Sequence, residues 1–195
     1  MLLSDTTAEL RRIALGAPAA DRFGTLYANI LLGSVVHELA LVRAFAGDPT
    51  TIDHVATWPD GVWPPSVGLT GRLPDDGRVT IDWHFLPDYP AYREEVRVIY
   101  DAATIELSFP SPYLLHRPTV LRVSTAVDGA WRDEAWTSTV EAFEEELLAF
   151  HTLVVDGRSS VVGVEAGRAD IVTCQRAIAA LARTHGVAIG GEAAG

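Results

Sequence analysis

The part of the chain that most constrains its fold runs from residue 52 to residue 125, where short β-rich segments alternate with turn residues. Apolar and polar residues alternate in segment 79–85, which is typical of a strand with one apolar face and one mixed face. The mixed face would carry Thr80, Asp82 and His84. The sequence Pro-Asp-Asp-Gly at 74–77 predicts a hairpin turn. The strands expected from this pattern are 52–58, 68–73, 79–85, 95–100, 104–109 and 120–125.

Helical periodicity flanks these strands on both sides. We expect helices over 5–15 and 32–46, the second ending at Gly47 with Pro49 beyond it. Ser138 and Glu141 resemble a capping box before a helix, and a last helix is expected over 166–183. The apolar stripe of the helix after Glu141 would consist of Val140, Phe143, Leu147, Phe150 and Val154.

Helices, then strands, then helices predict an α+β fold with an open, mostly antiparallel sheet and helices packed on one face. We expect one domain over residues 1–190 and a disordered tail at 191–195. Because a sheet covered on one face leaves the other free to associate, the sequence predicts a homodimer through the mixed face with Thr80, Asp82 and His84.

Composition excludes several classes of function. The net charge is −11 with no basic patch, so nucleic acid is not expected as a partner. All 15 basic residues are arginine, which excludes lysine chemistry such as a Schiff base or a P-loop. The single cysteine, Cys174, cannot form an internal disulfide and is expected as a small buried residue.

Sequence signals for export, membranes and metals are not found. The first residues do not form a charged segment followed by an apolar one, and no run approaches eighteen apolar residues, so we expect a cytoplasmic protein without a membrane span. The six histidines show no H-x-H or H-x-x-x-H spacing, and no metal site is expected. No serine lies in a G-x-S-x-G sequence.

Three stretches together, in this order and spacing, resemble the C-terminal, substrate-side domain of the Gfo/Idh/MocA oxidoreductases. The first resembles a helix with a histidine and a closing Gly-Asp-Pro turn: Gly33-Ser34-Val35-Val36-His37-Glu38-Leu39, Arg43 and Gly47-Asp48-Pro49. The second resembles a mid-sheet hairpin with the bend after it: Glu95-Val96-Arg97-Val98, Ile105-Glu106-Leu107 and Pro110-Ser111-Pro112-Tyr113. The third resembles a final helix pair: Ala142-Phe143-Glu144-Glu145-Glu146-Leu147, Phe150-His151, Gly157-Arg158, Glu165, Gly167 and Arg168.

The nucleotide-binding half of that family has no counterpart in the sequence. No G-x-G-x-x-G follows a strand near the N-terminus, and the family's E-K-P lysine is missing. Gly33 also stands where many members carry an aspartate one turn before the histidine. The resemblance therefore implies that this chain alone binds no cofactor, and that NAD(P) would enter only with a separate Rossmann chain.

His37 is the candidate catalytic residue. On a helical wheel it lies opposite the apolar stripe, beside small residues such as Gly33 and Ala40 that leave room for a ligand. Its imidazole suits proton transfer near neutral pH, and it matches the histidine of the family's substrate helix. A surface or packed histidine with a structural hydrogen bond is the alternative. The stripe consists of Leu32, Val35, Leu39 and Val42.

Five further residues are candidates for binding substrate. Tyr27 and Asn29 precede the histidine helix and offer hydrogen bonds, unless the amide only caps local backbone. His84 lies on the mixed strand face, which would equally suit a subunit interface. Tyr113 and His116 follow the Pro-Ser-Pro bend, where a loop on a rigid scaffold often carries function.

Three functions remain open. The first is a free-standing enzyme that performs acid/base chemistry without NAD, namely isomerisation, elimination, dehydration or assisted cyclisation, with His37 as the acid or base. The second is the substrate-binding subunit or fragment of a split NAD(P)-dependent oxidoreductase. The third is a non-catalytic binding or oligomerisation module. For the first two, the family resemblance implies a polyol, a sugar or another oxygenated small molecule as substrate.

Overall fold

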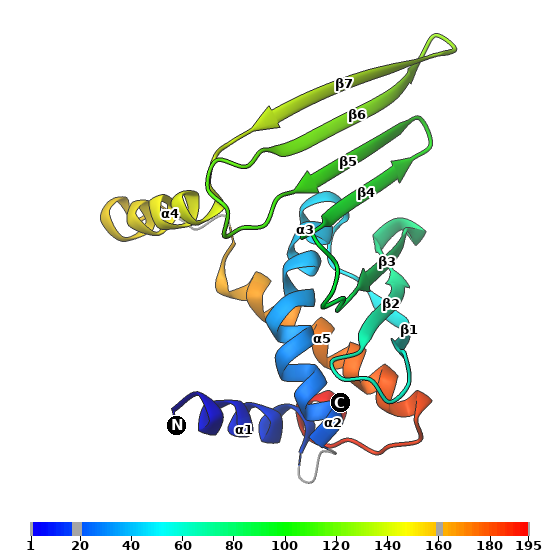
Figure 1. Ribbon diagram of the computed structural model, residues 1–195, viewed down its shortest axis with the longest axis vertical. Helices are drawn as coiled ribbons and strands as arrows, with labels where there is room; N and C mark the ends of the chain where they lie inside the picture. Colours follow the sequence, from blue (N-terminus) through cyan, green and yellow to red (C-terminus); the bar gives the residue numbers. More distant parts are fainter. Residues whose placement is uncertain (1, 17–20, 159–161, 195) are drawn as a thin grey trace. The chain divides into compact units, whose positions relative to one another are not determined.

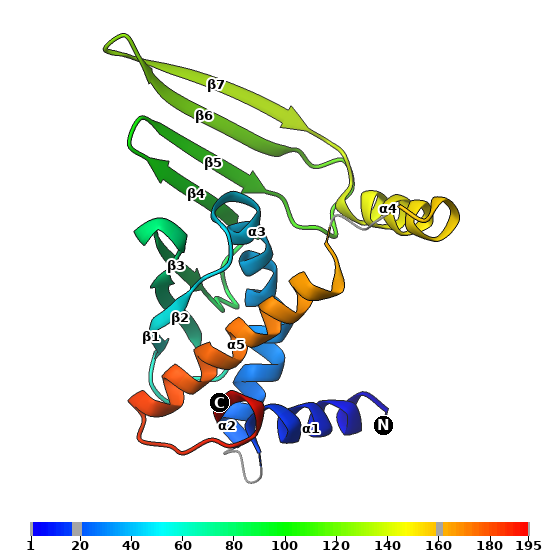
Figure 2. The ribbon, with the colours of Figure 1, turned by 180° about the vertical axis from the view of Figure 1, so that it is seen from behind.

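The computed structural model describes residues 2–16, 21–158 and 162–194 (Figures 1 and 2). The chain divides into two compact units. Unit 1 consists of Met1–Leu86 and Val162–Gly195, and unit 2 consists of Pro87–Val161. Whether the two form the single domain predicted over 1–190 stays a prediction, and each unit is described by itself.

Unit 1 is built around one long helix of three consecutive segments. These are the α-helix α2 (Asp21–Leu26), the π-helix η1 (Tyr27–Val35) and the α-helix α3 (Val36–Ala46). The wider π turn brings every fourth residue to nearly the same side, so the buried residues Tyr27, Leu31 and Val35 align. Gly47 then adopts a positive φ of 81° and ends the helix, as the Gly–Pro signal predicts.

Two more helices and a small sheet complete unit 1. They are α1 (Leu2–Leu15), α5 (Val164–Thr184) and the antiparallel strands β1 (Thr51–Trp58), β2 (Ser66–Arg72) and β3 (Arg78–Trp83), in that order. The predicted turn at 74–77 contains a short 3-10 helix, η2 (Pro74–Asp76). The apolar side chains of alternate strand positions, such as Val79 and Ile81, face inward, and α5 packs against β1, η1 and α3.

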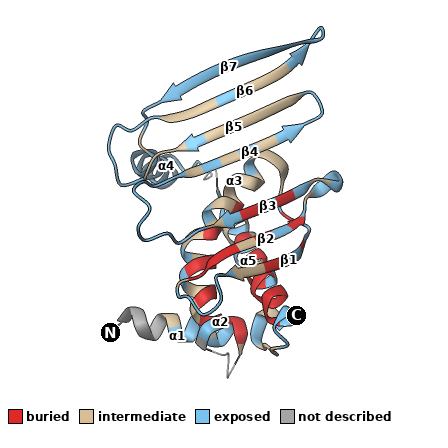
Figure 3. Cartoon of the chain, turned by 45° about the vertical axis from the view of Figure 1, so that its right-hand side comes forward, coloured by how far each residue is buried: buried red, intermediate tan, exposed pale blue. Residues whose placement is uncertain are grey.

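The core of unit 1 joins these helices and strands. Leu31 and Ile178 are fully buried, and Cys174 is a small buried residue as predicted, its thiol directed at the Leu31 carbonyl oxygen at 3.6 Å. Ile171 of α5 is exposed. Figure 3 shows that the buried positions of this unit follow the long helix, α5 and the inner side of the sheet.

The C-terminal segment packs against the end of α1 up to residue 194; residue 195 lies outside the described residues, and disorder over 191–195 stays a prediction. Gly191–Ala194 form the short 3-10 helix η3, and the Gly190 amide donates to the Leu15 carbonyl at 2.7 Å. Gln175 also donates to the Glu192 carboxylate at 2.8 Å. The tail is held because glycine lets its backbone approach the end of α1: a Cβ on Gly191 would lie 2.3 Å from the Ile13 carbonyl oxygen.

The long helix is long and apolar enough to cross a membrane, although no such span was expected from the sequence. By length and composition Arg22–Ala46 could cross a membrane, with a mean hydropathy of 1.5 in its most apolar stretch. Core helices pass the same test, and a third of that stretch is buried inside unit 1. Its buried face packs on α5, but a signal sequence near the N-terminus would pass the same test, so the cytoplasmic localisation stays a prediction.

Unit 2 is a four-stranded antiparallel meander followed by one helix. The strands β4 (Glu94–Tyr100), β5 (Ala103–Phe109), β6 (Thr119–Val127) and β7 (Ala130–Ser138) pair in sequence order, and α4 (Ala142–Asp156) comes after them. One sheet face is apolar, since Val96, Leu107, Leu121 and Trp136 lie in register. Among its described residues, 87–158, none is buried (Figure 3).

The α+β class and the open antiparallel arrangement are confirmed, although the strands form two sheets rather than one. The capping-box prediction is wrong: Ser138 ends β7, and Glu141 precedes α4 without a side-chain cap. The sequence also missed β7, whose residues are exposed throughout. The predicted apolar stripe of α4 exists, but its side chains are exposed rather than packed.

Candidate functional site

Tyr27 lies inside unit 1 rather than on its surface. Its side chain is 1% exposed, and burial raises the pKa of its hydroxyl to about 12, with Cys174 and Glu192 adding to the rise. A hydrogen bond with Gln175 of α5 opposes that rise and holds the ring in place. Substrate binding by Tyr27 stays a prediction, and this burial argues against it.

Asn29 and His37 lie on exposed positions of the same long helix. Gly33, one turn before His37, is also exposed, and a Cβ placed there would meet only the Ala28 carbonyl oxygen, at 3.6 Å. The small-residue surroundings expected for His37 are therefore present. A catalytic role for His37 stays a prediction.

The predicted Gly-Asp-Pro turn after α3 is anchored by an ion-pair network. Arg43 donates through Nε to Asp48 at 2.6 Å, and through Nη2 to the nearly buried Asp170 of α5. Burial by itself would lower the pKa of Arg43, but the two carboxylates outweigh it and raise that pKa above its usual value. These residues fix the end of the histidine helix, so their role is positional. No pattern in the sequence indicated that Asp170 pairs with Arg43.

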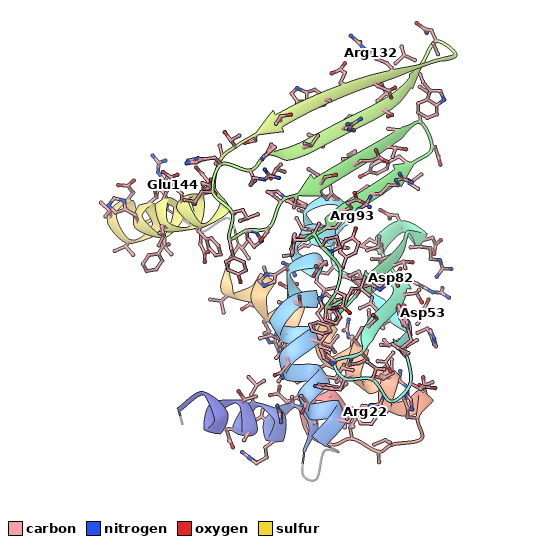
Figure 4. The ribbon with its side chains drawn as sticks, viewed as in Figure 1. Arg22, Asp53, Asp82, Arg93, Arg132 and Glu144 are labelled. Atoms are coloured by element: carbon pink, nitrogen blue, oxygen red, sulfur yellow. The ribbon has the colours of Figure 1, made fainter. Side chains whose placement is uncertain are left out.

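His84 lies just beyond β3 beside an aromatic platform. Its ring centroid is 5.7 Å from that of Trp58, edge to face. The exposed Asp82, which Figure 4 labels, lies on the same side of the sheet as His84. Gly68 makes room for this group, because a Cβ there would lie 2.8 Å from Asp82 Oδ1 and 3.0 Å from the Trp58 ring. An imidazole, a carboxylate and an indole thus meet on the mixed face.

The mixed face is connected to the histidine helix through the opposite side of β3. Trp83 Nε1 donates to Ser34 Oγ at 2.9 Å, which ties β3 to η1 three residues before His37. Trp83 also stacks on Phe85, with ring centroids 6.4 Å apart. Trp83 is partly buried and packs against the core cluster.

Tyr113 and His116 lie in unit 2, on the bend between β5 and β6. The Tyr113 ring contacts Phe143 of α4 at a centroid distance of 6.2 Å, and it is 83% exposed. The His116 amide donates to Glu141, whose carboxylate also lies 3.7 Å from His116 Nδ1. Between bend and helix runs an open apolar groove of about 470 Å³, lined by Pro112, Leu115, Glu141, Phe143, Glu144, Leu147, Leu148 and His151.

The six predicted site residues therefore fall into two sets. Tyr27, Asn29, His37 and His84 belong to unit 1, whereas Tyr113 and His116 belong to unit 2. The structure adds Trp58 to the surroundings of His84, and Glu141 to those of His116. Among the described residues, no three His, Cys, Asp or Glu side chains gather in a way that could hold a metal ion.

Comparison with known proteins gives the fold only. No family model matches the chain, and no curated protein does. A solved structure of a candidate NADPH-dependent oxidoreductase from Desulfitobacterium hafniense DCB-2 matches with a TM-score of 0.62 and 13% sequence identity. The match covers 87% of this chain and 48% of that one, so this chain spans about half the length of the protein it resembles. The fold is thus related to that of an oxidoreductase.

Proposed function

We propose that this chain is the substrate-side part of an NAD(P)-dependent oxidoreductase, and that it works with a nucleotide-binding unit outside its 195 residues. The observation that carries the proposal is the structural match, which accounts for most of this chain and only half of a candidate NADPH-dependent oxidoreductase. The remaining half of such an enzyme would hold the coenzyme.

The described residues do not themselves fit a dinucleotide. Such a site needs a parallel βαβ unit with a glycine-rich turn leading into a helix. The strand pairs in the described ranges are all antiparallel, and the printed sequence has no G-x-G-x-x-G. We therefore assign coenzyme binding to the nucleotide-binding unit outside this chain, and we describe no chemical step of this chain that uses the coenzyme.

The chain's own contribution would be to hold an oxygenated substrate and to move one proton. His37 can exchange a proton with a substrate hydroxyl, since a histidine titrates near neutral pH and this one is exposed beside the small Gly33. The Trp58, Asp82 and His84 group suits a polyol or sugar, because an indole packs on C–H groups while the carboxylate and imidazole accept and donate hydrogen bonds.

The test uses the 195-residue chain with polyols, sugars and coenzymes. Saturation-transfer NMR should detect weak binding of an oxygenated compound, whereas calorimetry with NADH and NADPH should show none. His37→Ala should weaken substrate binding about 2–10-fold, the usual worth of one neutral hydrogen bond, and His37→Gln should retain most of it. His185→Ala, at an exposed histidine that follows α5 and lies off the mixed face, is the matched control.

Two results would overturn the proposal. A micromolar dissociation constant for either coenzyme would place the nucleotide site in this chain. Conversion of a substrate without any coenzyme would favour the free-standing acid/base enzyme instead.

A further inference from the structure

The apolar surface of unit 2 is larger than its size explains. Helix α4 carries Phe143, Leu147, Phe150 and Val154 at spacings of four, three and four residues, which places them on one face. Each of these side chains is more than half exposed. Next to this stripe, Tyr113, Leu114 and Leu115 of the bend are also more than half exposed.

Unit 2 has no buried residue among its described residues, 87–158. An apolar surface of this kind is stable in water when another protein surface covers it. We infer that a second copy of this chain covers α4, through an antiparallel, two-fold pairing of the α4 stripes with the neighbouring bend as rim. This inference does not rest on the proposed function. It differs from the dimer predicted through Thr80, Asp82 and His84, a face that is polar and carries the Asp53 ion pairs with Arg72 and Arg78.

The area fits a dimer of ordinary size. The seven side chains of the stripe and the bend are on average about two thirds exposed. Together they offer on the order of 700 Å² of surface per copy, close to the roughly 800 Å² per partner of a standard interface. The helix of 15 residues is about 22 Å long, which accommodates the whole stripe.

Charge complementarity selects the antiparallel arrangement. Glu144, Glu145 and Glu146 lie at the start of α4 (Figure 4 labels Glu144), and parallel copies would place both acidic clusters side by side. With the copies antiparallel, the clusters lie at opposite ends. The stripe then matches itself, since Phe143 faces Val154 of the second copy and Leu147 faces Phe150.

The same arrangement pairs unlike groups along one edge. Glu144 and His151 lie on the same flank of the stripe, seven residues apart. In the antiparallel pair, Glu144 of each copy lies within side-chain reach of His151 of the other. The two-fold axis makes this contact twice, as e and g positions do in coiled coils.

The experiment measures the mass of the full chain by light scattering and sedimentation from about 0.1 to 100 μM. The wild type should give twice 21.0 kDa, and Leu147→Glu or Phe150→Glu should weaken association at least about 100-fold, because each dimer then buries two charges. Val164→Glu, at a still more exposed valine at the start of α5, should remain dimeric.

A charge exchange tests the orientation without touching the stripe. Glu144→Arg should weaken the dimer by a few-fold, and adding His151→Glu should restore it, whereas circular dichroism should show the same helix content in all variants. A monomeric wild type would overturn the inference. A dimer that survives both stripe substitutions would also overturn it, and sensitivity to Asp82→Arg would then place the interface on the mixed face.

Discussion

Replacing Leu31 with alanine tests the conclusion that the core lies in unit 1. Leu31 is 0% exposed, and its carbonyl oxygen accepts the Cys174 thiol. The substitution removes three carbon atoms, worth about 2.4 kcal/mol at ~0.8 kcal/mol per buried carbon group. A cavity among the side chains of the long helix and α5 adds to that, so the expected loss in free energy of unfolding is about 3–5 kcal/mol.

Leu147→Ala is the matched control, because it removes the same atoms from a side chain that is 68% exposed. No cavity forms there, and the loss should stay below about 1 kcal/mol. Urea denaturation followed by circular dichroism, at about 0.2 μM protein, measures both. The loss for Leu31→Ala should not change with protein concentration, whereas that for Leu147→Ala should grow with concentration if α4 pairs with a second copy. Equal losses at low concentration would refute the assignment of the core.

Two further outcomes follow from unit 1. Burial raises the pKa of the Cys174 thiol from 9.0 to about 12 and that of the Tyr27 hydroxyl to about 12. As the pH rises, the unfolded chain therefore releases these protons before the folded chain does. The free energy of unfolding should be highest below about pH 9 and should fall as the pH rises towards 12. Cys174→Ala should remove up to about 3 kcal/mol of that dependence in urea titrations at pH 8 to 11, and an unchanged slope would contradict it. Gly71→Ala should cost about 2–4 kcal/mol in thermal or urea unfolding, since its Cβ would lie 2.3 Å from the Thr51 carbonyl oxygen, while Gly167→Ala, with open space around it, should be neutral or stabilising.

The strands were predictable where apolar and polar residues alternate, whether or not the apolar face is buried. In β3 the alternation of buried Val79 and Ile81 with exposed neighbours is visible in the residues themselves, and its predicted bounds agree within two residues. Strand β7 has no such alternation because it is an edge strand exposed throughout. Its one local signal is the turn before it, where Asp128 and Gly129 both adopt positive φ, the pattern of a tight hairpin.

The long helix shows a different limit of sequence reading. Helical periodicity was recognised only from residue 32, because Gly24 interrupts the preceding segment and lowers its intrinsic helix propensity. The structure begins the helix at Asp21, and the packing of η1 on α5 overrides that propensity. Tyr27, at the start of the π segment Tyr27–Val35, is buried in the core, but it lies before the predicted helix and was therefore not assigned to its buried face. His37 lies beyond the π segment, and its exposed position was predicted from the wheel.

The apolar stripe of α4 shows why spacing alone does not decide what a helix face contacts. The stripe of Val35 and Leu39 in unit 1 and that of Phe143 and Leu147 in unit 2 have the same four-residue spacing, yet the first pair is buried and the second is exposed. Helical periodicity indicates that one face of a helix is apolar, but it does not indicate whether residues of the same chain pack against that face. In unit 1 the cover is α5. In unit 2 the exposed stripe, the groove beside it and the absence of buried residues in 87–158 make assembly the simplest way to complete a core. If both proposals hold, unit 1 binds the substrate and unit 2 sets the oligomeric state.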